Sequence, residues 1–291
     1  MRPLLWLGFF LPLVLAAETV TVATYNLQNY LVMDRRVEGR WREDYPKPEA
    51  EKAALREVIL AMDADILCVQ EIGGPEFLEQ VQEDLKREGL NYPHRAVLIG
   101  PDEVRRVGVL SRIPFEQTFS HDKIAFKYHS IEEQVRRGTL ELVFETEGVR
   151  WSLFNLHLKS RWQVRDDDPL AAKQRTGEAQ AVRDLIRAKY SNPERDRYMI
   201  VGDFNDTKES APLRRFLKVS DRQLTSMLDA VDTRGDAWTF HYRKRDFYER
   251  VDFILVSPAL EKHVTSARVV DHFPATRTAS DHRPVVVTLE F

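Results

Sequence analysis

The sequence predicts one α/β domain in which β-sheets stack on one another and helices cover their outer faces. Two observations favour this fold class. Many stretches rich in β-branched and aromatic residues are bounded by Gly, Pro, Asp or Asn, and helical patterns separate only some of them. A parallel doubly wound sheet would need a stricter alternation of strand and helix. No repeat or low-complexity linker interrupts the chain, so we expect one domain over residues 18–291.

The expected strands are short β-prone runs distributed over the whole chain. They are Thr19–Tyr25, Ile66–Gln70, Arg95–Ile99, Val107–Leu110, Gly138–Glu145, Trp151–His157, Tyr198–Gly202, Val251–Val256, Ala267–Asp271 and Val285–Phe291. The expected helices are Pro48–Met62, Pro75–Glu88, Leu170–Tyr190 and Pro212–Leu217. Pro48 suits a first helical turn, Gly89 a C-cap, and the acidic run 166–168 a helix N-terminus. A metal site in that acidic run is the weaker interpretation, because three adjacent side chains do not converge on one ion.

Residues 1–17 have the layout of a secretory signal peptide. One basic residue, Arg2, precedes the apolar run Leu4–Ala17, which small residues close. The alternatives are an uncleaved anchor or a buried helix. We expect the protein to leave the cytoplasm and to be secreted or periplasmic. No later segment is long and apolar enough to span a bilayer, so no membrane span is expected after signal removal.

The composition allows a sizeable core but gives the chain no global attraction for polyanions. Hydrophobic residues make up 43% of the chain, and loss of Arg2 with the signal peptide takes the formal net charge from −3 to −4. A nucleic acid would therefore have to meet local basic patches. Cys68 is the single cysteine, which excludes an intrachain disulfide, and its apolar neighbours predict a small buried hydrophobe.

Polar side chains stand where several predicted strands end, which is where rigid scaffolds present catalytic groups. Asn26 closes the first strand, as either a turn former or an amide ligand to a phosphate or metal. Glu71 follows the strand that carries Cys68. Hard cations such as Mg²⁺ take one or two carboxylates and keep several waters. Glu71 is therefore the leading candidate metal ligand.

Strand alternation places Asn155, His157 and Lys159 on one face, opposite two leucines. A histidine between leucines is equally consistent with a satisfied core residue, but its polar companions favour a site. His157 would donate to a phosphate oxygen, and Asn155 would contribute to substrate binding. Lys159 and Arg161 would hold neighbouring phosphates.

The C-terminal half adds further carboxylates, an amide and a histidine. Asp203 and Asn205 follow an apolar run and share a face, so together they can orient a water and a phosphate. Asp252 begins a strand, and its alternative role is a surface Arg–Asp pair of little energetic value. His282 is a candidate general base or charge-stabilising imidazolium, and Asp252 could fix its tautomer. Asp281 could bind metal or water.

The set of acids, histidines and amides has no economical structural explanation, because burying so many charges without function costs free energy. The chain contains no Ser-His-Asp elbow, P-loop, HExxH or GxGxxG motif that would indicate another chemistry.

The combined motifs resemble the endonuclease/exonuclease/phosphatase superfamily, which contains DNase I. From residue 24 to residue 282 they run in family order: the Asn turn, Gln-Glu, Val-Gly-Val-Leu-Ser-Arg, Asn-Leu-His-Leu-Lys-Ser, Gly-Asp-Phe-Asn, Trp-Thr-Phe, Arg-Val-Asp-Phe-Ile and Ser-Asp-His. The resemblance implies a DNase I-like four-layer sandwich, with two central, mostly antiparallel β-sheets flanked by helices. It also implies a divalent metal, usually Mg²⁺, with Mn²⁺ or Ca²⁺ as alternatives.

The resemblance assigns roles residue by residue. Asn26 and Glu71 fall in the metal region, His157 at a phosphate contact, Asp203 and Asn205 at the nucleophile and phosphate, Asp252 beside His282, and Asp281 at a second metal or leaving-group position. The chain lacks the Pro-Asn-Ala-Gly pattern of abasic-site endonucleases and the Trp-Cys-Asp-Arg pattern of inositol polyphosphate 5-phosphatases. Both subfamilies become less favoured, and the segment at His157 is more similar to secreted bacterial nucleases.

These observations predict an exported, Mg²⁺-dependent phosphodiesterase in which water attacks the phosphate in line, with Asp203 or His282 as the base. The expected substrate is DNA or RNA, bound by a monomer without a stable protein partner. The local basic rim would comprise Arg105, Arg106, Arg112, Arg136, Arg137, Lys159, Arg161, Arg243, Lys244 and Arg245, with Tyr242, Phe247 and Tyr248 stacking on bases or sugars. The alternatives are a sphingomyelinase-like phospholipase C, another small phosphodiesterase or phosphatase, and an inactive polyanion-binding module.

Overall fold

The structure is a computed structural model, and it describes residues 17–291. The predicted signal peptide, residues 1–17, therefore lies outside the described residues apart from Ala17. Within residues 17–291, no helix combines the length and the apolar character that crossing a bilayer requires.

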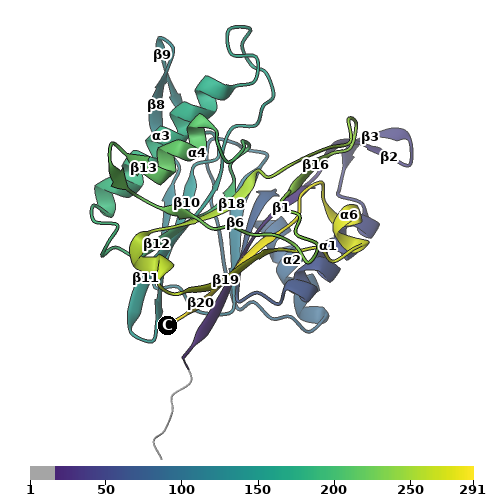
Figure 1. Ribbon diagram of the computed structural model, residues 1–291. Coiled ribbons are helices and arrows are strands. Elements are labelled where there is room, and N and C mark those ends of the chain that lie inside the picture. Colours follow the sequence, from purple (N-terminus) through teal and green to yellow (C-terminus); the bar gives the residue numbers. More distant parts are fainter. Residues whose placement is uncertain (1–16) are drawn as a thin grey trace, which may run out of the picture.

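Two six-stranded sheets form the centre of the molecule (Figure 1). The first sheet has, in spatial order, β19 (Val264–Val269), β20 (Val285–Glu290), β1 (Thr19–Tyr30), β4 (Ile66–Ile72), β6 (Arg106–Ser111) and β5 (His94–Val97). The second has β15 (Ser226–Met227), β18 (Asp252–Val256), β12 (Tyr198–Asp203), β11 (Val149–His157), β10 (Thr139–Thr146) and β7 (Gln117–His121). Each strand has enough partners to satisfy its backbone, apart from those at the edges.

Each sheet contains one parallel pair, β1 with β4 in the first and β11 with β12 in the second. Every other neighbouring pair within the two sheets is antiparallel. The prediction of mostly antiparallel sheets is therefore confirmed. The parallel pairs also have a consequence for function, because the carboxyl ends of both strands in such a pair meet at one edge of the sheet.

Three apolar layers hold the sheets and helices together. Val22, Cys68, Leu153 and Val201 belong to the layer between the two sheets, where Cys68 is a buried free cysteine as predicted. A second layer lies between the first sheet and the helices α1 (Glu49–Met62), α2 (Pro75–Arg87) and α6 (Ala275–Ala279). A third lies between the second sheet and α3 (Ala172–Lys189) and α4 (Ala211–Leu217), giving a helix–sheet–sheet–helix sandwich. The four-layer prediction is confirmed.

Each predicted strand and helix is present, with ends shifted by a few residues. The acidic run 166–168 acts at a helix N-terminus as predicted, but through one residue. The carboxylate of Asp168 accepts hydrogen bonds from the backbone N–H groups of Lys173 and Gln174, at 3.2 and 3.1 Å. These groups are the donors that a first helical turn leaves unpaired.

Several short elements of the structure are not among those predicted from the sequence. They include four two-stranded hairpins: β2 (Met33–Val37) with β3 (Arg40–Tyr45), β8 (Ala125–Tyr128) with β9 (Ile131–Gln134), β13 (Lys218–Val219) with β14 (Arg222–Gln223), and β16 (Phe240–Tyr242) with β17 (Phe247–Glu249). The others are β7, β15, α6 and α5 (Pro258–Glu261). The β2–β3 hairpin is rich in charged residues and exposed, so it lacks the apolar alternation that marks a strand in sequence. The strands of the other hairpins are only two to four residues long, which is too short for a clear pattern.

Candidate active site

The candidate active site lies where the two parallel pairs end. Asn26 and Glu71 lie at the carboxyl ends of β1 and β4, and His157 and Asp203 occupy the last positions of β11 and β12. Asp252 begins β18, which runs antiparallel to β12, so it stands directly opposite Asp203. Two sheets thus present polar side chains at the same end of the sandwich.

Strand alternation aims these side chains toward the space between the sheets. Met199 and Val201 precede Asp203 on the same face of β12, and both belong to the core between the sheets. Ile254 and Val256 follow Asp252 on the same face of β18, and both belong to the same core. Since side chains of one face repeat every second residue, the site forms the polar end of the inter-sheet core.

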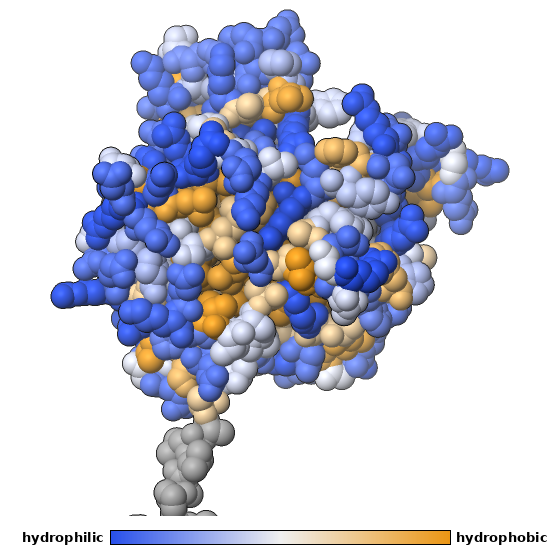
Figure 2. All heavy atoms as spheres, viewed as in Figure 1, coloured by the Kyte–Doolittle hydropathy of each residue, from blue (hydrophilic) through white to orange (hydrophobic). Residues whose placement is uncertain are grey.

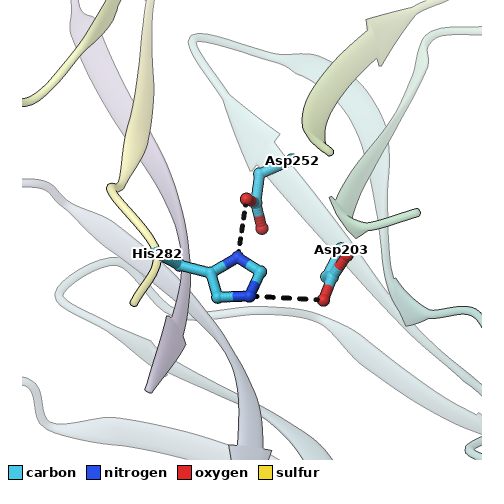
Figure 3. A group of neighbouring side chains, drawn as sticks. All are labelled: Asp203, Asp252 and His282. Carbon is cyan, nitrogen blue, oxygen red and sulfur yellow. Dashed lines mark hydrogen bonds and ion pairs between the residues drawn. The ribbon is translucent and has the colours of Figure 1, made fainter. Parts of the chain in front are cut away.

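His282 lies between two aspartates (Figure 3). Its Nδ1 lies 2.8 Å from Oδ2 of Asp252, and its Nε2 faces Oδ2 of Asp203 at 3.9 Å. All three side chains are buried. A carboxylate on Nδ1 fixes the tautomer and orientation of an imidazole, so that Nε2 is available to a substrate or water. The predicted pairing of Asp252 with His282 is therefore present in the structure.

Burial and charge shift the proton affinities of this group. Burial alone would lower the pKa of His282, but the carboxylates of Asp252 and Asp203 outweigh it and hold that pKa well above its usual value. Burial raises the pKa of Asp203 to about 7, and the neighbouring Asp252 adds to the shift. A carboxylate with a pKa near neutrality suits proton transfer at physiological pH.

Two amides orient the carboxylate of Asp203. Nδ2 of Asn26 donates to its Oδ2 at 3.0 Å, across from one sheet to the other. Asn205 donates its backbone N–H to Oδ1 at 2.8 Å and its side-chain amide to Oδ2 at 3.2 Å. Asn205 has a φ of 54°, in the left-handed region, where Asn is more readily tolerated than most residues. Asn26 thus contacts Asp203 directly, in addition to standing near Glu71.

A β-bulge aims Glu71 into the site. The register of β4 shifts between Gln70 and Ile72, and Glu71 itself has a φ of 58°. Simple alternation would place Glu71 with Leu67 and Val69 on the helix-covered face of the sheet, and a bulge re-aims such a side chain. Its Oε2 accepts the backbone N–H of Asn29 at 2.9 Å.

His157 points its Nε2 toward the centre of the site. This atom lies 3.5 Å from Oδ2 of Asp203 and 4.0 Å from Oε1 of Glu71. Burial lowers the pKa of His157 well below its usual value, and the nearby cation of Arg137 adds to the effect. The ring is therefore neutral at pH 7, with its Nε2 facing both carboxylates.

The oxygen donors near Glu71 fit a hard divalent cation. Burial raises the pKa of Asp281, and the neighbouring Glu71 carboxylate raises it further. Two carboxylates that disfavour each other's charge would be stabilised by a cation between them, and such oxygen ligands suit Mg²⁺, Mn²⁺ or Ca²⁺. Asp203, Asp252 and His282 also have ligand atoms within 4.8 Å of one another. However, Nδ1 of His282 is already bonded to Asp252, which leaves Nε2 as the ring atom open to another partner.

Comparison with known proteins decides the family. Residues 23–282 match the family model described as Endonuclease/Exonuclease/phosphatase family. The chain belongs to this family. Its members are metal-dependent hydrolases, mostly phosphodiesterases and nucleases. The match covers each of the site residues described above, so the resemblance seen in the sequence motifs is confirmed. No curated protein matches the chain in sequence.

Solved structures of this family share the fold. A family protein from Bacteroides thetaiotaomicron is 19% identical, with a TM-score of 0.65 over 94% of this chain and 98% of that one. The human Nocturnin catalytic domain, solved with a bound sulfate anion, is 18% identical, with a TM-score of 0.63 and coverages of 94% and 95%. A beta toxin from Staphylococcus aureus is 16% identical, with a TM-score of 0.64 and coverages of 92% and 99%. At such identities the likeness establishes the fold alone.

Asn155 occupies a different place from the one predicted. It shares the inter-sheet face with His157, as predicted. However, it lies two residues before His157 on β11, further into the core, and it is fully buried. Its Nδ2 donates to the carbonyl oxygens of Val69 and Gly108, at 3.2 and 2.9 Å, and its Oδ1 accepts from Gln70 at 2.8 Å. The amide therefore joins the two sheets, and no part of it is left to contact a substrate.

Substitution of Asn155 by alanine should lower stability rather than substrate affinity. The change leaves the buried amide of Gln70 without this partner, and an unsatisfied buried polar group costs about 1–3 kcal/mol. We expect a lower melting temperature with KM unchanged for the folded enzyme. A raised KM with unchanged stability would restore Asn155 to the substrate-binding residues.

Lys159 and Arg161 lie near the site but are held by other groups. Nζ of Lys159 is buried and donates to the carbonyl oxygens of Ser160 and Trp162, at 2.9 and 2.8 Å. Arg161 pairs with Glu249 at 2.6 Å and donates from Nε to the carbonyl oxygen of Asn205 at 3.3 Å. Arg161 thus supports the Asn205 segment.

Two residues outside the predicted set hold the backbone of site residues, and a third is fixed next to His282 in the sequence. Oγ1 of Thr239 accepts the backbone N–H of Asp252 at 3.0 Å. Ser280 accepts the backbone N–H of His282 at 3.0 Å and donates to the carbonyl oxygen of Asn26 at 2.8 Å. Arg283 is buried, and its Nη1 pairs with Asp232 at 2.7 Å. Thr239 and Ser280 belong to the Trp-Thr-Phe and Ser-Asp-His motifs, so these motifs could have identified both residues from the sequence.

Proposed function

We propose that this protein is an exported, Mg²⁺-dependent phosphodiesterase and that its substrate is a nucleic acid. The arrangement of His282 carries the proposal, because its ring is bonded to Asp252 on one side and faces Asp203 on the other, within 4.0 Å. Export rests on the apolar N-terminal segment of the sequence. Cell fractionation, with the N-terminal residue of the mature protein determined, tests that part separately.

Each side chain has a role in hydrolysis. Asp203, oriented by Asn26 and Asn205, takes the proton of the attacking water. His282 stays protonated because of Asp252, so its Nε2 donates a proton or a hydrogen bond to an oxygen of the phosphate. Nε2 of His157 contacts a non-bridging oxygen. Aligned donors of this kind stabilise charge that develops in the transition state.

Glu71 and Asp281, with Asn26 nearby, are the residues that would hold the metal. When bound, Mg²⁺ supplies a Lewis acid that offsets negative charge on the phosphate or on the leaving oxygen. The bulge at Glu71 and its hydrogen bond from the Asn29 backbone keep the carboxylate in place for this role.

The β16–β17 hairpin supports a nucleic acid substrate. Phe240 at its start pairs with His282, so the hairpin borders the site directly. The side chains of Tyr242, Phe247 and Tyr248 are 40%, 47% and 41% exposed, as stacking on bases or sugars would require. Arginines 243 and 245 lie in the same hairpin. Arg112, by contrast, was wrongly placed in the basic rim: it pairs with carboxylates that precede β4, at the opposite end from the site.

An assay panel with Mg²⁺ tests the proposal. The mature protein is incubated with plasmid DNA, single-stranded DNA, RNA, sphingomyelin and a phosphomonoester, with an EDTA control. We expect metal-dependent cleavage of at least one nucleic acid. Absence of such cleavage would overturn the nuclease assignment. Binding of polyanions without any hydrolysis would instead support an inactive binding module.

One observation favours a lipid substrate as the second candidate. Trp41 on the β2–β3 hairpin is 65% exposed, and Tyr45 at the end of the same hairpin is 37% exposed. An exposed aromatic hairpin can enter a membrane surface. The hairpin also carries many charged residues, however, and the face in Figure 2 is mostly hydrophilic, with apolar residues in small groups. The sphingomyelin assay therefore separates the two candidates.

A further inference from the structure

A cationic cavity lies beside the active site, next to Glu71. It has a volume of about 530 Å³. Its lining residues are Glu71, Arg105, Arg136, Arg137, Lys159, Ser160, Trp162 and Val164, and Glu71 is the one acid among them. Because the lining continues to Glu71, a substrate held at the metal-binding carboxylate would extend into this cavity.

Glu178 on α3 holds two of the cationic segments together. Its side chain is fully buried, and the hydrolytic reaction does not use it. Its Oε1 accepts the backbone N–H of Arg136 at 3.1 Å, and its Oε2 accepts that of Lys159 at 2.7 Å. One buried carboxylate therefore places the loop before β10 next to the segment that follows β11.

Asp102 adds the third segment in the same way. Its Oδ1 accepts the backbone N–H groups of Val104 and Arg105, at 3.0 and 2.9 Å. Its Oδ2 lies 3.0 Å from Nε of Arg137 and 3.5 Å from Nε of Arg136. Two buried carboxylates thus hold the three backbone segments that carry four cationic residues around one cavity, at the energetic cost of burying charge. Such a cost indicates a built site rather than a solvated basic loop.

The positive charge of the cavity exceeds the negative charge that supports it. Lys159 donates only to carbonyl oxygens, and Nε of Arg105 donates to the side-chain oxygen of Asn29 at 2.7 Å. Burial lowers the pKa of Lys159 to about 8, and the nearby Arg137 contributes to the shift. Cations that oppose one another in this way favour an anion among them.

Trp162 supplies an aromatic surface at the edge of the same cavity. Trp162 is 79% exposed, which is the largest value among the large hydrophobic residues in the part of the chain that the structure describes. Its backbone is not free, because its carbonyl oxygen accepts Nζ of Lys159 at 2.8 Å. A fixed backbone with an open indole ring suits stacking on a base, which contributes to binding single-stranded nucleic acids.

We propose that this cavity is a subsite for the nucleotide next to the scissile bond, whose phosphate binds the cationic wall and whose base stacks on Trp162. The inference rests on the proposed phosphodiesterase function and narrows its substrate to chains with at least two phosphates. A phosphodiester with no neighbouring phosphate leaves the cationic wall of the subsite without a ligand.

Small substrates separate the subsite from the chemistry. The rate of phosphodiester hydrolysis without a neighbouring phosphate is measured with bis(p-nitrophenyl) phosphate and with the dinucleotide TpT. The subsite is measured with pTpT and TpTp, which add a phosphate at one end or the other. We expect wild type to cleave at least one of the phosphorylated dinucleotides about 10- to 100-fold more efficiently than TpT, the effect typical of a charge-assisted contact.

Arg136→Gln is the principal variant. The Arg136 side chain is half exposed, and its backbone bond to Glu178 survives the change. We expect it to lose the preference for the added phosphate and to retain wild-type rates on TpT and bis(p-nitrophenyl) phosphate. Arg150→Gln is the matched control, because this arginine is similarly exposed but lies at the opposite end of β11. An unchanged preference in Arg136→Gln would overturn the subsite.

A binding measurement keeps the test independent of catalysis. Fluorescence anisotropy of a short labelled oligothymidylate in EDTA should show about tenfold weaker binding for Arg136→Gln and for Trp162→Ala than for wild type or Arg150→Gln. Equal binding by all four proteins would overturn the subsite. Weakened binding, together with no hydrolysis of any phosphodiester by wild type, would overturn the proposed function while supporting an anion-binding cavity. Inorganic phosphate is added as a competitor in the assays with TpTp and pTpT. These assays distinguish a subsite for a nucleic acid chain from a site for free inorganic phosphate.

Discussion

Replacement of His282 by alanine is expected to lower kcat/KM for a phosphodiester about 10²–10⁴-fold, the usual contribution of a positioned acid–base group. The reason is geometric. Nε2 of His282 faces Asp203, and Nδ1 is held by Asp252 at 2.8 Å, so removal of the ring removes the donor at the reacting phosphate. Steady-state kinetics on bis(p-nitrophenyl) phosphate and on DNA, at saturating Mg²⁺, measure the loss.

A double-mutant cycle shows whether His282 and Asp252 act as one unit. Asp252→Asn should also lower kcat strongly, because the amide no longer holds the imidazolium. The double variant should be no slower than the slower single variant, since residues that work together are not additive. Additive losses in the double variant would show that the two residues act separately.

A second, exposed pair of the same type serves as the control for this cycle. Nε2 of His272 lies 3.0 Å from Glu57, and both side chains are well exposed. His272→Ala should leave kcat/KM unchanged. Circular dichroism and thermal melting of each variant establish that the folded state is retained, so that loss of activity is not loss of structure.

Replacement of Glu71 by glutamine is expected to weaken Mg²⁺ binding at least 10- to 100-fold, the range seen even when a partner of a metal ligand is lost. The neutral amide removes one of the two carboxylates that a divalent cation would offset, and it leaves Asp281 as the remaining charge. Isothermal titration calorimetry with Mg²⁺ measures the weakened binding directly, without reference to activity.

The activity of the Glu71→Gln variant should require correspondingly higher Mg²⁺ concentrations. Glu83→Gln is the matched control, because Glu83 is an exposed glutamate of α2. Wild-type Mg²⁺ affinity in Glu71→Gln would contradict the assignment and would direct attention to the cluster of Asp203, Asp252 and His282 as the metal site. Titration with Mn²⁺ and Ca²⁺ in parallel identifies the preferred ion.

Much of the architecture and of the site was predictable from local sequence patterns. Apolar alternation and turn residues place the main strands and helices, because these signals depend on neighbours a few residues apart. The same alternation predicts that His157 and Asn155 share a face, and they do. The β2–β3 hairpin escaped prediction because an exposed strand needs no apolar face, and the other hairpins did so because their strands are only two to four residues long.

The tertiary structure alone decides how far each residue reaches into the site. Asn155 and His157 differ by two positions on one strand, yet the first joins the two sheets while the second points at Asp203 and Glu71. The reason is that the opposite sheet determines which residues of a strand are covered and which face the site. The strands of that sheet are distant in sequence. Glu71 reaches the site through a bulge, and the left-handed residue of that bulge is Glu71 itself rather than a glycine.

The chain's own sequence therefore determined which groups take part, through the residue types at its strand ends and the order of its motifs. It did not determine the partners of those groups. Asp252 with His282, and Glu178 with the backbones of Arg136 and Lys159, are contacts between residues 19 to 42 positions apart in sequence. Buried charges find partners only when the sheets and helices pack, because burial and electrostatic compensation arise from the whole fold.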